Sequence, residues 1–570
     1  MDIFVLVCLL IVILILIKNI FEPSLVFLGL LTFYFLLGLI NVNDFLISFV
    51  NKSIIILTLL IIIADVLART QITQIINKAV GVRKRNIFRT GIIVSILSSF
   101  LSNTLVVQMF IKLLDNKPYK SKLLLPVSYL AILGGTTTLI GTSTNLIANG
   151  FLLEMGLKPF NFFDFAYVGI PLVIAGLLYL TFFAPKILKH KEDEQIQEQS
   201  DYFLEAKVLN GSALHNKTIV QNKLRNLENL FLAEIIRNNQ LISPVKPDEI
   251  VLENDILVFT GDIANIKELQ HIDGLEIFEQ KDDILNRNLV LAVISHNSDL
   301  LNCKIKECNF RKKFNAAIIA IKREGEQLKG KIGDIKLKIG DQLVLAIGDS
   351  FSLTREIKTN FYLLSDINTI DKLNVKKSVF VYLSFIAVVI LSAINIISLI
   401  KGLLILLFIY MIFGFISFNN VLKNINVNLI ILLGSALGIS KVLVSNGAAD
   451  ILSNFIISIG HNIGVYGTFI VLYIFSIILT ELTMNASAVA IAFPVAYIAA
   501  TTLGVNPEPF IFAVTYGSSA SFLTKFGYQC NFLVSAAGNY RARDFLKLGL
   551  PLSIIYGIIV ITLVPVFFKF

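Results

Sequence analysis

Small polar residues and glycines interrupt the apolar sequence at corresponding places in each half of the chain. The interruptions are, in the first half, Ser102-Asn103-Thr104, 134–138 and 141–145, and, in the second half, 480–485, 518–521 and 527–531. Backbone that is not helical is tolerated at membrane depth where it lines a cavity or binds a ligand. Interruptions that recur in inverted orientation are typical of a secondary transporter whose binding site lies between two repeats.

The composition places the chain among membrane proteins. Of its 570 residues, 55% are hydrophobic, and apolar runs close to the spanning length of about 20 residues recur at both ends. No small-residue cleavage site follows the apolar residues 3–17, so we expect no cleavable signal. Cys303 and Cys308 have no second pair and no histidine near them, which predicts free thiols in a reducing cytosol rather than a metal site.

Basic residues set the expected orientation in the membrane. They cluster on both sides of the first interruption, before the central insert and before the last span: Arg69, Lys78, Arg83, Lys84, Arg85, Arg89, Lys112, Lys117, Lys120, Lys122, Lys186, Lys189, Lys191, Arg541, Arg543 and Lys547. By the positive-inside rule these loops face the cytoplasm, whereas the loops 42–45, 151–165 and 441–463 face outward. We therefore expect both termini outside, in a multi-pass protein of the plasma or inner membrane.

The expected fold is a polytopic α-helical membrane protein built from two inverted repeats. Each repeat has about five spans, a re-entrant hairpin and a broken helix. The expected parts are repeat one (1–190) with an inward-opening hairpin at 87–115 and a broken span at 123–150, repeat two (371–570) with an outward-opening hairpin at 464–503 and a broken span at 509–536, and surface segments at 70–86 and 447–461. About ten spans result.

Residues 191–370 have a different composition, with runs of charge and strand-like alternation. This segment repeats itself after about 86 residues, which predicts two small tandem domains. The matching residues are Leu214, Asn216, Ile219, Ile235, Arg237, Asp255, Leu257 and Val258, paired with Leu300, Asn302, Ile305, Ile321, Arg323, Asp341, Leu343 and Val344. We expect an inserted cytoplasmic α+β tandem domain, with its copies at about 200–282 and 286–368.

Together these motifs resemble the divalent anion–sodium symporter family of the ion transporter superfamily. The shared pattern is Ser-Asn-Thr, then Gly-Gly-x-x-Thr-Leu-Ile-Gly-Thr-x-x-Asn, then Asn-Ala and Ser-Phe-x-x-x-x-Gly-Tyr-Gln-x-Asn in the second half. The insert resembles the RCK-C (TrkA-C) domains of a subgroup related to sulfate permeases. The resemblance implies a homodimer that works as an elevator, with a transport domain moving against a scaffold and sodium bound at each hairpin tip.

The resemblance also implies roles for individual residues. Sodium site one would use Ser98, Ser102, Asn103 and the backbone at Gly141, and sodium site two would use Thr480, Thr483, Asn485 and the backbone at Gly527. The anion would lie between the tips, near Asn103, Thr104, Thr142, Asn485, Tyr528 and Lys525. The chemistry agrees with these roles, because sodium takes oxygen ligands and helix N-termini present N–H groups to an anion.

Lys525 stands where members of this family usually have proline. A lysine at membrane depth costs about 2.5–3.5 kcal/mol on insertion scales, so it should have a partner. Three interpretations stay open. The side chain could extend along the helix to water, pair with Glu481, or replace the second sodium or contact the anion directly.

We therefore expect a sodium-coupled symporter of a small divalent anion, either sulfate or a di- or tricarboxylate. The alternatives are a cation–proton antiporter of the same superfamily, for which Glu481 is the clear acidic candidate, and a channel or nutrient sensor gated by the insert. Enzyme motifs are missing from the sequence, and the charge of +9 does not imply a nucleic acid polymer. The expected partners are the anion, membrane lipid and a second copy of the chain; a nucleotide ligand of the insert stays open, although the insert has no glycine-rich phosphate loop.

Overall fold

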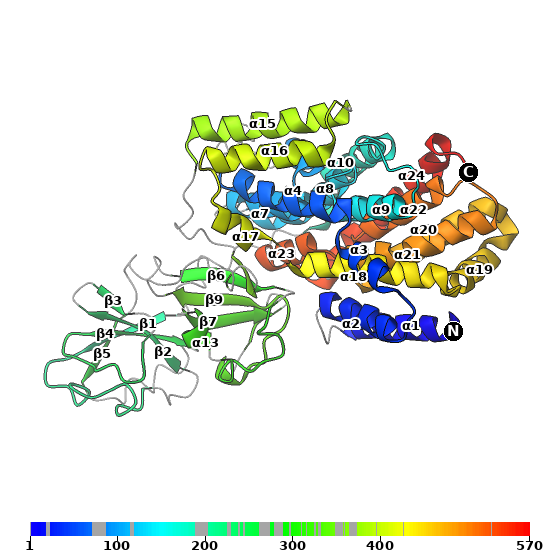
Figure 1. Cartoon of the computed structure of the whole chain (residues 1–570). Helices are drawn as coiled ribbons and strands as arrows, with labels where there is room; N and C mark the ends of the chain where they lie inside the picture. Colours follow the sequence, from blue (N-terminus) through cyan, green and yellow to red (C-terminus); the bar gives the residue numbers. More distant parts are fainter. Residues whose placement is uncertain are drawn as a thin grey trace. The chain divides into compact units, whose positions relative to one another are not determined.

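The computed structural model divides the chain into two compact units (Figure 1). A helical unit comprises Met1–Lys189 and Asp371–Phe570, and an inserted unit comprises His190–Ile370. The residues described are 2–18, 23–70, 87–114, 119–188, 203–224, 230–237, 240–242, 245–261, 274–278, 289–295, 298–308, 310–314, 316–323, 326–328, 332–347, 357, 360–363, 373–394, 396–425, 427–525 and 527–570. The predicted surface segment 70–86 lies outside these residues, apart from Thr70.

The helical unit contains two series of helices that follow the same order. The first series is α1 (Asp2–Lys18), α2 (Pro23–Leu36), α3 (Val42–Phe49), α4 (Lys52–Ala68), α6 (Ile87–Phe100), α7 (Asn103–Leu114), α8 (Lys120–Gly135), α9 (Ser143–Glu154) and α10 (Ala166–Ile187). The second series is α15 (Val375–Ala393), α16 (Leu399–Ile412), α17 (Phe418–Asn424), α18 (Val427–Ser445), α19 (Ala448–Gly460), the short η5 (His461–Ile463), α20 (Gly464–Leu482), α21 (Asn485–Thr502), α22 (Glu508–Ser519), α23 (Gln529–Ala537) and α24 (Ala542–Phe567). A short helix occupies the third place of each series, with 8 residues in α3 and 7 in α17.

Seven stretches of the described helices are long and apolar enough to cross a membrane, which is fewer than the predicted ten or so. They are Val42–Leu67, Ala166–Ile187, Val375–Ala393, Val427–Ser445, Ala448–Leu482, Asn485–Thr502 and Ala542–Phe567. The difference arises because α1, α2 and α16 are apolar but have fewer than 18 residues, and because each predicted broken span is divided into two short helices, α8 and α9 or α22 and α23. The prediction of a loop at 42–45 is wrong: α3 begins there, because the Asn41 side chain accepts from the Asp44 N–H at 2.7 Å and caps the helix.

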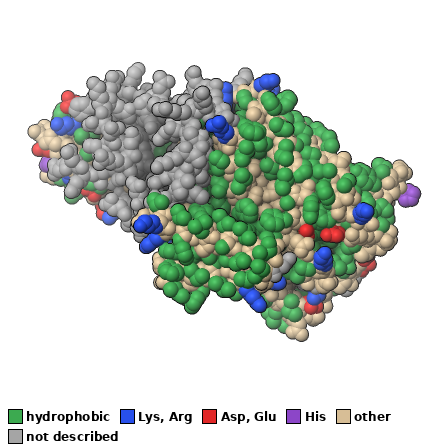
Figure 2. Space-filling view, turned by 90° about the horizontal axis from the view of Figure 1, so that it is seen from above, with side chains coloured by type: hydrophobic (Ala, Val, Ile, Leu, Met, Phe, Trp, Pro, Cys, Tyr) green, Lys and Arg blue, Asp and Glu red, His purple; other side chains and the backbone are tan. Residues whose placement is uncertain are grey.

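The outer surface of the helical unit is apolar over a wide area. Figure 2 shows hydrophobic side chains over much of one face. On α15 and α16, Leu383 is 62% exposed, Phe408 65% and Ile412 66%. Contiguous apolar surface of this kind is unusual on a soluble monomer and is expected on a protein surrounded by lipid.

The inserted unit contains two five-stranded antiparallel sheets with the same topology. The first has the order β3-β2-β4-β1-β5 and the second has the order β8-β7-β9-β6-β10. The strands are β1 (Phe203–Val208), β2 (Leu230–Arg237), β3 (Gln240–Ile242), β4 (Ile256–Gly261), β5 (Leu275–Phe278), β6 (Leu289–Ile294), β7 (Ala316–Arg323), β8 (Glu326–Gln327), β9 (Gln342–Ile347) and β10 (Phe361–Leu363), with α13 (Phe310–Phe314) before β7 and the short η4 (Ile332–Asp334) before β9. A register shift lies between Leu232 and Glu234 in β2 and recurs between Ile318 and Ala320 in β7.

An arginine–aspartate pair joins the same two strands in each copy. Arg237 Nε donates to Asp255 Oδ1 at 2.9 Å, and Arg323 Nε donates to Asp341 Oδ1 at 2.7 Å. The two aspartate side chains are 1% and 0% exposed. The hydrogen bond with Asp255 raises the pKa of Arg237 above its ordinary value. Because a charge is tolerated in a protein interior when it is paired, each aspartate depends on its arginine.

The two cysteines of the inserted unit are joined in the structure. Cys303 and Cys308 form a disulfide with a Cα–Cα distance of 6.1 Å, inside the usual range for this bond. The prediction of free thiols is therefore wrong for this pair, because the turn brings the two side chains together, which their spacing alone did not reveal. Cys8 and Cys530 are free.

Candidate functional site

Each hairpin consists of two helices that meet at a non-helical tip. In the first hairpin α6 ends at Phe100 and α7 begins at Asn103; in the second, α20 ends at Leu482 and α21 begins at Asn485. The first break is stabilised locally, since the Ser102 hydroxyl accepts from the Leu105 N–H at 3.4 Å. The tip asparagine thus occupies the first helical position of the second arm in both hairpins.

The side chain of Asn103 lies in a cluster of oxygens at the first tip. Its Oδ1 lies 2.6 Å from Ser98 Oγ, 3.1 Å from Ala131 O and 3.3 Å from Gly141 O, while its Nδ2 lies 3.1 Å from the Tyr528 hydroxyl. Of these three oxygens, only Ser98 Oγ carries a hydrogen to donate. Two arrangements satisfy the Asn103 amide and the oxygens around it. In the first, a cation lies among the oxygens. In the second, the amide turns by half a turn, so that its nitrogen faces the three oxygens and its own oxygen faces the Tyr528 hydroxyl.

Two glycines allow this close approach. A Cβ at Gly135 would lie 2.4 Å from Asn103 Oδ1, and a Cβ at Gly141 would lie 2.5 Å from the Gly135 carbonyl oxygen. No side chain fits at either position without displacing its neighbours. The sequence therefore needs glycine at both ends of this break to bring the hairpin tip against the broken helix.

The second tip has a different hydrogen-bonding pattern. Asn485 Oδ1 accepts from the Thr480 hydroxyl at 2.8 Å and from the Ser521 hydroxyl at 2.7 Å. Thr480 Oγ1 also lies 2.7 Å from the Ser518 carbonyl oxygen. All four residues are buried, between 0% and 5% exposed.

Glu481 connects the second tip to the backbone of the second broken helix. Its Oε1 accepts from the N–H groups of Phe522 and Leu523, at 2.9 and 2.8 Å. Its Oε2 accepts from the N–H and the hydroxyl of Thr524, at 3.1 and 2.8 Å. A carboxylate bound to three consecutive N–H groups fixes the path of the unwound segment, because these donors have no helical partner.

The two broken helices have the same internal hydrogen bonds. Gly141 N donates to Thr138 Oγ1 at 3.2 Å, and Gly527 N donates to Thr524 Oγ1 at 3.0 Å. The amide nitrogen of Asn145 donates to Thr138 O at 2.8 Å, and that of Asn531 donates to Thr524 O at 3.2 Å. The equivalent residues are therefore Thr138 and Thr524, Gly141 and Gly527, and Asn145 and Asn531.

Residues of the two halves meet between the first tip and the second break. Besides Asn103 and Tyr528, Thr104 Oγ1 lies 3.4 Å from Gln529 Oε1, and Thr142 contacts the Tyr528 hydroxyl. Thr142 and Tyr528 precede α9 and α23, and neither side chain caps its helix. Helix N-termini without a side-chain cap offer N–H groups and a positive dipole end to an anion.

The structure places the predicted site residues in four kinds of surroundings. Ser98, Asn103, Gly141, Thr104, Thr142 and Tyr528 lie around the first tip, and Thr480, Asn485 and Gly527 lie around the second. Thr483 bonds back to the Leu479 carbonyl at 2.7 Å and Ser102 caps α7, so both side chains have local roles. Lys525 is half-buried in the second unwound segment, next to Thr524.

Sequence reasoning missed several residues of this site. They are Gly135, Thr138, Asn145, Ser521, Thr524 and Asn531, together with the backbone-binding role of Glu481. An alignment of the two halves with each other contains the signal, because Thr138, Gly141 and Asn145 have the same spacing as Thr524, Gly527 and Asn531.

Comparison with known proteins identifies this arrangement as that of a transporter. The family model described as "Citrate transporter" (CitMHS) matches residues 11–517 and 389–570. A Chlamydomonas reinhardtii protein named "Putative sulfur deprivation response regulator" is 29% identical over 567 residues, which cover 94% of this chain and 97% of that protein. The Escherichia coli transporter YfbS is 23% identical over 94% of this chain and 93% of its own length.

A second group of relatives matches over a shorter length. "Sodium/sulfate cotransporter 2" of Chlamydomonas reinhardtii is 29% identical over 380 residues, which cover 62% of this chain and 42% of that protein. The family match extends over most of the chain and includes both hairpins and both broken helices. The chain belongs to the citrate transporter family of the ion transporter superfamily and is a multi-pass membrane transporter rather than an enzyme.

Proposed function

We propose that the protein is a sodium-coupled symporter of a small divalent anion that works by an elevator mechanism. The names of its relatives support two anion classes, sulfate and a tricarboxylate such as citrate. We place sulfate first, because the sodium/sulfate cotransporters are relatives of the chain itself, whereas citrate is the name of the family as a whole.

The observation that carries the proposal is the position of the Asn103 amide. One end of the amide lies in the oxygen cluster of Ser98, Ala131 and Gly141, and the other end faces Tyr528. A cation among these oxygens requires the amide oxygen on its side, which directs the N–H groups toward Tyr528. The cation would thereby turn a donor toward the place where an anion would bind, which is a physical basis for coupling.

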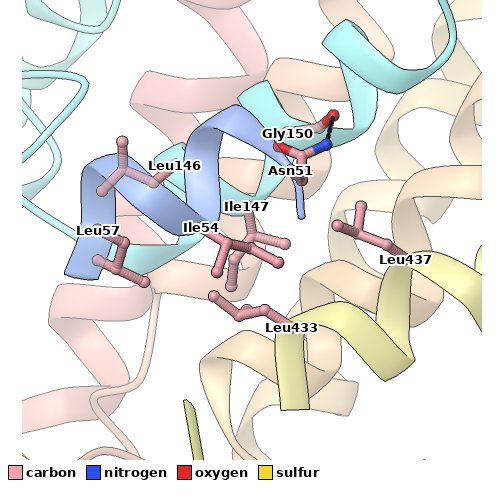
Figure 3. Close-up of a pocket in the computed structure, with 8 residues that line it drawn as sticks. All are labelled: Asn51, Ile54, Leu57, Leu146, Ile147, Gly150, Leu433 and Leu437. Carbon is pink, nitrogen blue, oxygen red and sulfur yellow. Dashed lines mark hydrogen bonds between the residues drawn. The ribbon is translucent and has the colours of Figure 1, made fainter. Parts of the chain in front are cut away.

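The packing of the helical unit supports an elevator. Helices α6–α10 pack with α20–α24, while α2 and α4 pack with α16 and α18. Where α9 meets α4 and α18, Figure 3 shows a small cavity with an apolar lining: Ile54, Leu57, Leu146, Ile147, Leu433 and Leu437, with Asn51 and Gly150 at one side. An apolar surface between two groups of helices allows them to slide, because few hydrogen bonds must break. The polar contact drawn in Figure 3 is a hydrogen bond in which Asn51 Nδ2 donates to Gly150 O at 3.3 Å.

The remaining parts of the proposal concern symmetry, sidedness and the insert. The shared order of helices and the shared bonds of the two breaks support two inverted repeats, with the tandem sheets as RCK-C-like regulatory domains in the cytoplasm. A homodimer, outward-facing termini and a nucleotide ligand of the insert remain part of the proposal.

The three interpretations of Lys525 also stand, although the described contacts of Glu481 are with backbone N–H groups and the Thr524 hydroxyl of the second broken helix.

Uptake by purified protein in liposomes tests the proposal. Radiolabelled sulfate, citrate and succinate are offered with an inward sodium gradient, with an equal proton gradient and with no gradient. We expect accumulation of one anion class that depends on the sodium gradient. Anion uptake driven by protons alone would contradict sodium coupling, whereas sodium–proton exchange without anion uptake would favour the cation–proton antiporter.

A nutrient sensor is the second candidate, and the name of one relative favours it. The Chlamydomonas protein that matches along nearly the full length is named as a regulator of the sulfur deprivation response. A sensor would bind the anion with sodium but would not accumulate it. Deletion of 196–368 separates the two roles: a transporter keeps uptake, with an altered rate if the insert regulates it, whereas a sensor loses its cytoplasmic output.

A further inference from the structure

The disulfide of the inserted unit lies in a turn that occurs in both copies of the tandem domain. In the repeat, Cys303 corresponds to Lys217 and Cys308 corresponds to Asn222. In the first copy the Asn222 amide nitrogen donates to the Lys217 carbonyl oxygen at 3.3 Å and to the Leu214 carbonyl oxygen at 2.9 Å. The same two positions are therefore joined in both copies, by a hydrogen bond in the first and by a disulfide in the second.

The backbone of the two turns is the same. Asn216 and Asn302 both lie in the left-handed region, with φ of 60° and 61°, a conformation in which asparagine is enriched. Their N–H groups donate to the carbonyl oxygens of Val251 and Leu337, at 2.9 and 2.8 Å. The first copy therefore shows that this turn forms without a disulfide.

The second turn also offers a hydrogen-bond partner to the reduced cysteines. The Lys304 carbonyl oxygen lies 3.0 Å from Cys308 Sγ and 3.5 Å from Cys303 Sγ. A thiol is a weak donor, so after reduction the S–H of Cys308 can donate to this oxygen, as Asn222 donates to a carbonyl oxygen in the first copy. Two closed arrangements of the turn are thus available, one with a disulfide and one with two thiols.

The position of the pair allows exchange with small molecules. Cys303 and Cys308 are both partly exposed, whereas Cys530 is buried. Thiol–disulfide exchange requires that a thiolate reaches a sulfur atom, so access limits its rate. On the proposed cytoplasmic side, disulfides are rare, and those that form are usually transient and respond to the redox state.

The turn is connected to the buried arginine–aspartate pair of the second sheet. The Cys303 carbonyl oxygen accepts from the Leu337 N–H at 3.1 Å. The neighbouring Lys336 carbonyl oxygen accepts from Arg323 Nη2 at 2.8 Å, and Arg323 also binds Asp341. A bond that fixes the turn therefore also restricts the opening of the segment that holds the Arg323 guanidinium.

We propose that Cys303 and Cys308 form a reversible thiol–disulfide switch in the second domain of the insert, which exchanges with small cytosolic disulfides of the glutathione class. The oxidised form makes the turn and the segment 335–337 more resistant to local opening, and the first copy does not respond. The inference goes beyond the transport activity and rests on the proposed cytoplasmic side of the insert.

The exchange balances without any further reactant. A protein thiolate attacks one sulfur atom of the small disulfide, which breaks its S–S bond, releases one small thiol and leaves a mixed disulfide on the protein. The thiolate of the second cysteine then attacks the protein sulfur of the mixed disulfide and releases the second small thiol. Two electrons pass from the protein to the small disulfide, and the two protons of the protein thiols end on the two small thiols. Two small thiols reverse both steps.

Hydrogen exchange of the purified full-length protein, measured by mass spectrometry in mixtures of reduced and oxidised glutathione, tests the inference. As the oxidised share rises, maleimide-reactive thiols should fall by two per chain, and exchange at 302–306 and 335–337 should slow by about tenfold, because a disulfide across a short loop restricts the open state. Both changes should reverse. The matching residues of the first copy, 216–220 and 249–251, are the internal control and should not change.

Two variants identify the cysteines responsible. Cys308→Asn places the residue of the first copy in the second turn, so it should fold and should lose both responses to glutathione. The double variant Cys303→Ser, Cys308→Ser should lose them as well, since Cys8 and Cys530 remain. A response that persists in the double variant would belong to another cysteine and would overturn the inference.

Other results would also overturn it. A pair that stays oxidised in excess reduced glutathione is a permanent structural bond, and a pair that stays reduced in excess oxidised glutathione is no switch. Equal hydrogen exchange in the two forms would show that the bond does not control the turn. Labelling of the pair by a membrane-impermeant maleimide in sealed right-side-out vesicles would instead refute the cytoplasmic placement, and the exchange seen with purified protein would not depend on that result.

Discussion

Gly135→Ala tests the geometry of the first hairpin tip with the addition of a single methyl group. The new Cβ would lie 2.4 Å from Asn103 Oδ1 and 2.8 Å from its Nδ2. To restore an ordinary contact, the amide must move away by about 1 Å, and a misplacement of this size costs up to about 100-fold in rate at a preorganised site. Extra volume in a packed interior costs about 1–3 kcal/mol of stability, so the protein should still fold.

The assay is initial sulfate uptake in liposomes over a range of sodium concentrations, together with thermal unfolding in detergent. We expect uptake to fall at least tenfold, with a large rise in the sodium concentration that gives half-maximal rate. Gly29→Ala is the matched control, because a Cβ at this helical glycine of α2 meets no atom within 4 Å. Normal uptake and sodium dependence in Gly135→Ala, at levels equal to the Gly29→Ala control, would refute the assignment of Asn103 to the cation site.

Four further predictions concern other parts of the chain. Asn103→Ala should abolish sodium-dependent uptake but leave a folded, inserted protein, and wild-type transport in this variant would remove the residue from the site. Arg237→Ala leaves the buried Asp255 carboxylate without its guanidinium and should destabilise the first sheet by about 3–5 kcal/mol. Proteolysis of the insert at increasing urea concentrations measures this loss of stability, and an unchanged midpoint of unfolding would contradict the role of the pair. Reduction of the wild-type protein should increase maleimide labelling by two thiols per chain, and reduction of a variant that lacks both Cys303 and Cys308 should not change the labelling. Full labelling of the wild type before reduction would contradict the disulfide. Lys525→Met should weaken anion affinity if the ammonium contacts the anion, and an unchanged affinity and sodium slope in this variant would leave extension to water or pairing with Glu481 as its role.

The positions of the breaks were accessible from the sequence because the cost of polar residues in an apolar segment has a clear signature. α6 and α7 extend from residue 87 to 114, against a predicted hairpin at 87–115, and α20 and α21 extend from 464 to 502, against 464–503. The number of spans was less accessible. The helices of the first hairpin and of the broken spans are too short to span alone, whereas α20 and α21 of the second hairpin are long enough, so hydropathy alone does not say which of them cross.

The direction of each side chain at a break could not be predicted. Ser102 and Thr483 have the residue type of a sodium ligand, yet one caps α7 and the other bonds to the preceding turn, as hydroxyls in membrane helices often do. The sequence allows Glu481 to be a proton carrier or the partner of Lys525, whereas its described contacts are N–H groups and a hydroxyl 41 to 43 residues away. Such contacts depend on the path of an unwound backbone, for which sequence patterns give no periodicity.

The contact between Asn103 and Tyr528 also has a consequence for biosynthesis. The two residues are 425 positions apart, so at about 5–20 residues per second the ribosome completes Tyr528 about 20–85 s after Asn103. During this interval the first hairpin must wait in or near the membrane with its polar tip lacking the partner from the second half. Truncated or stalled chains should therefore expose this tip to quality-control proteases. Substitutions that slow the docking of α23 should reduce the amount of mature protein more than they reduce the stability of the protein once it has folded.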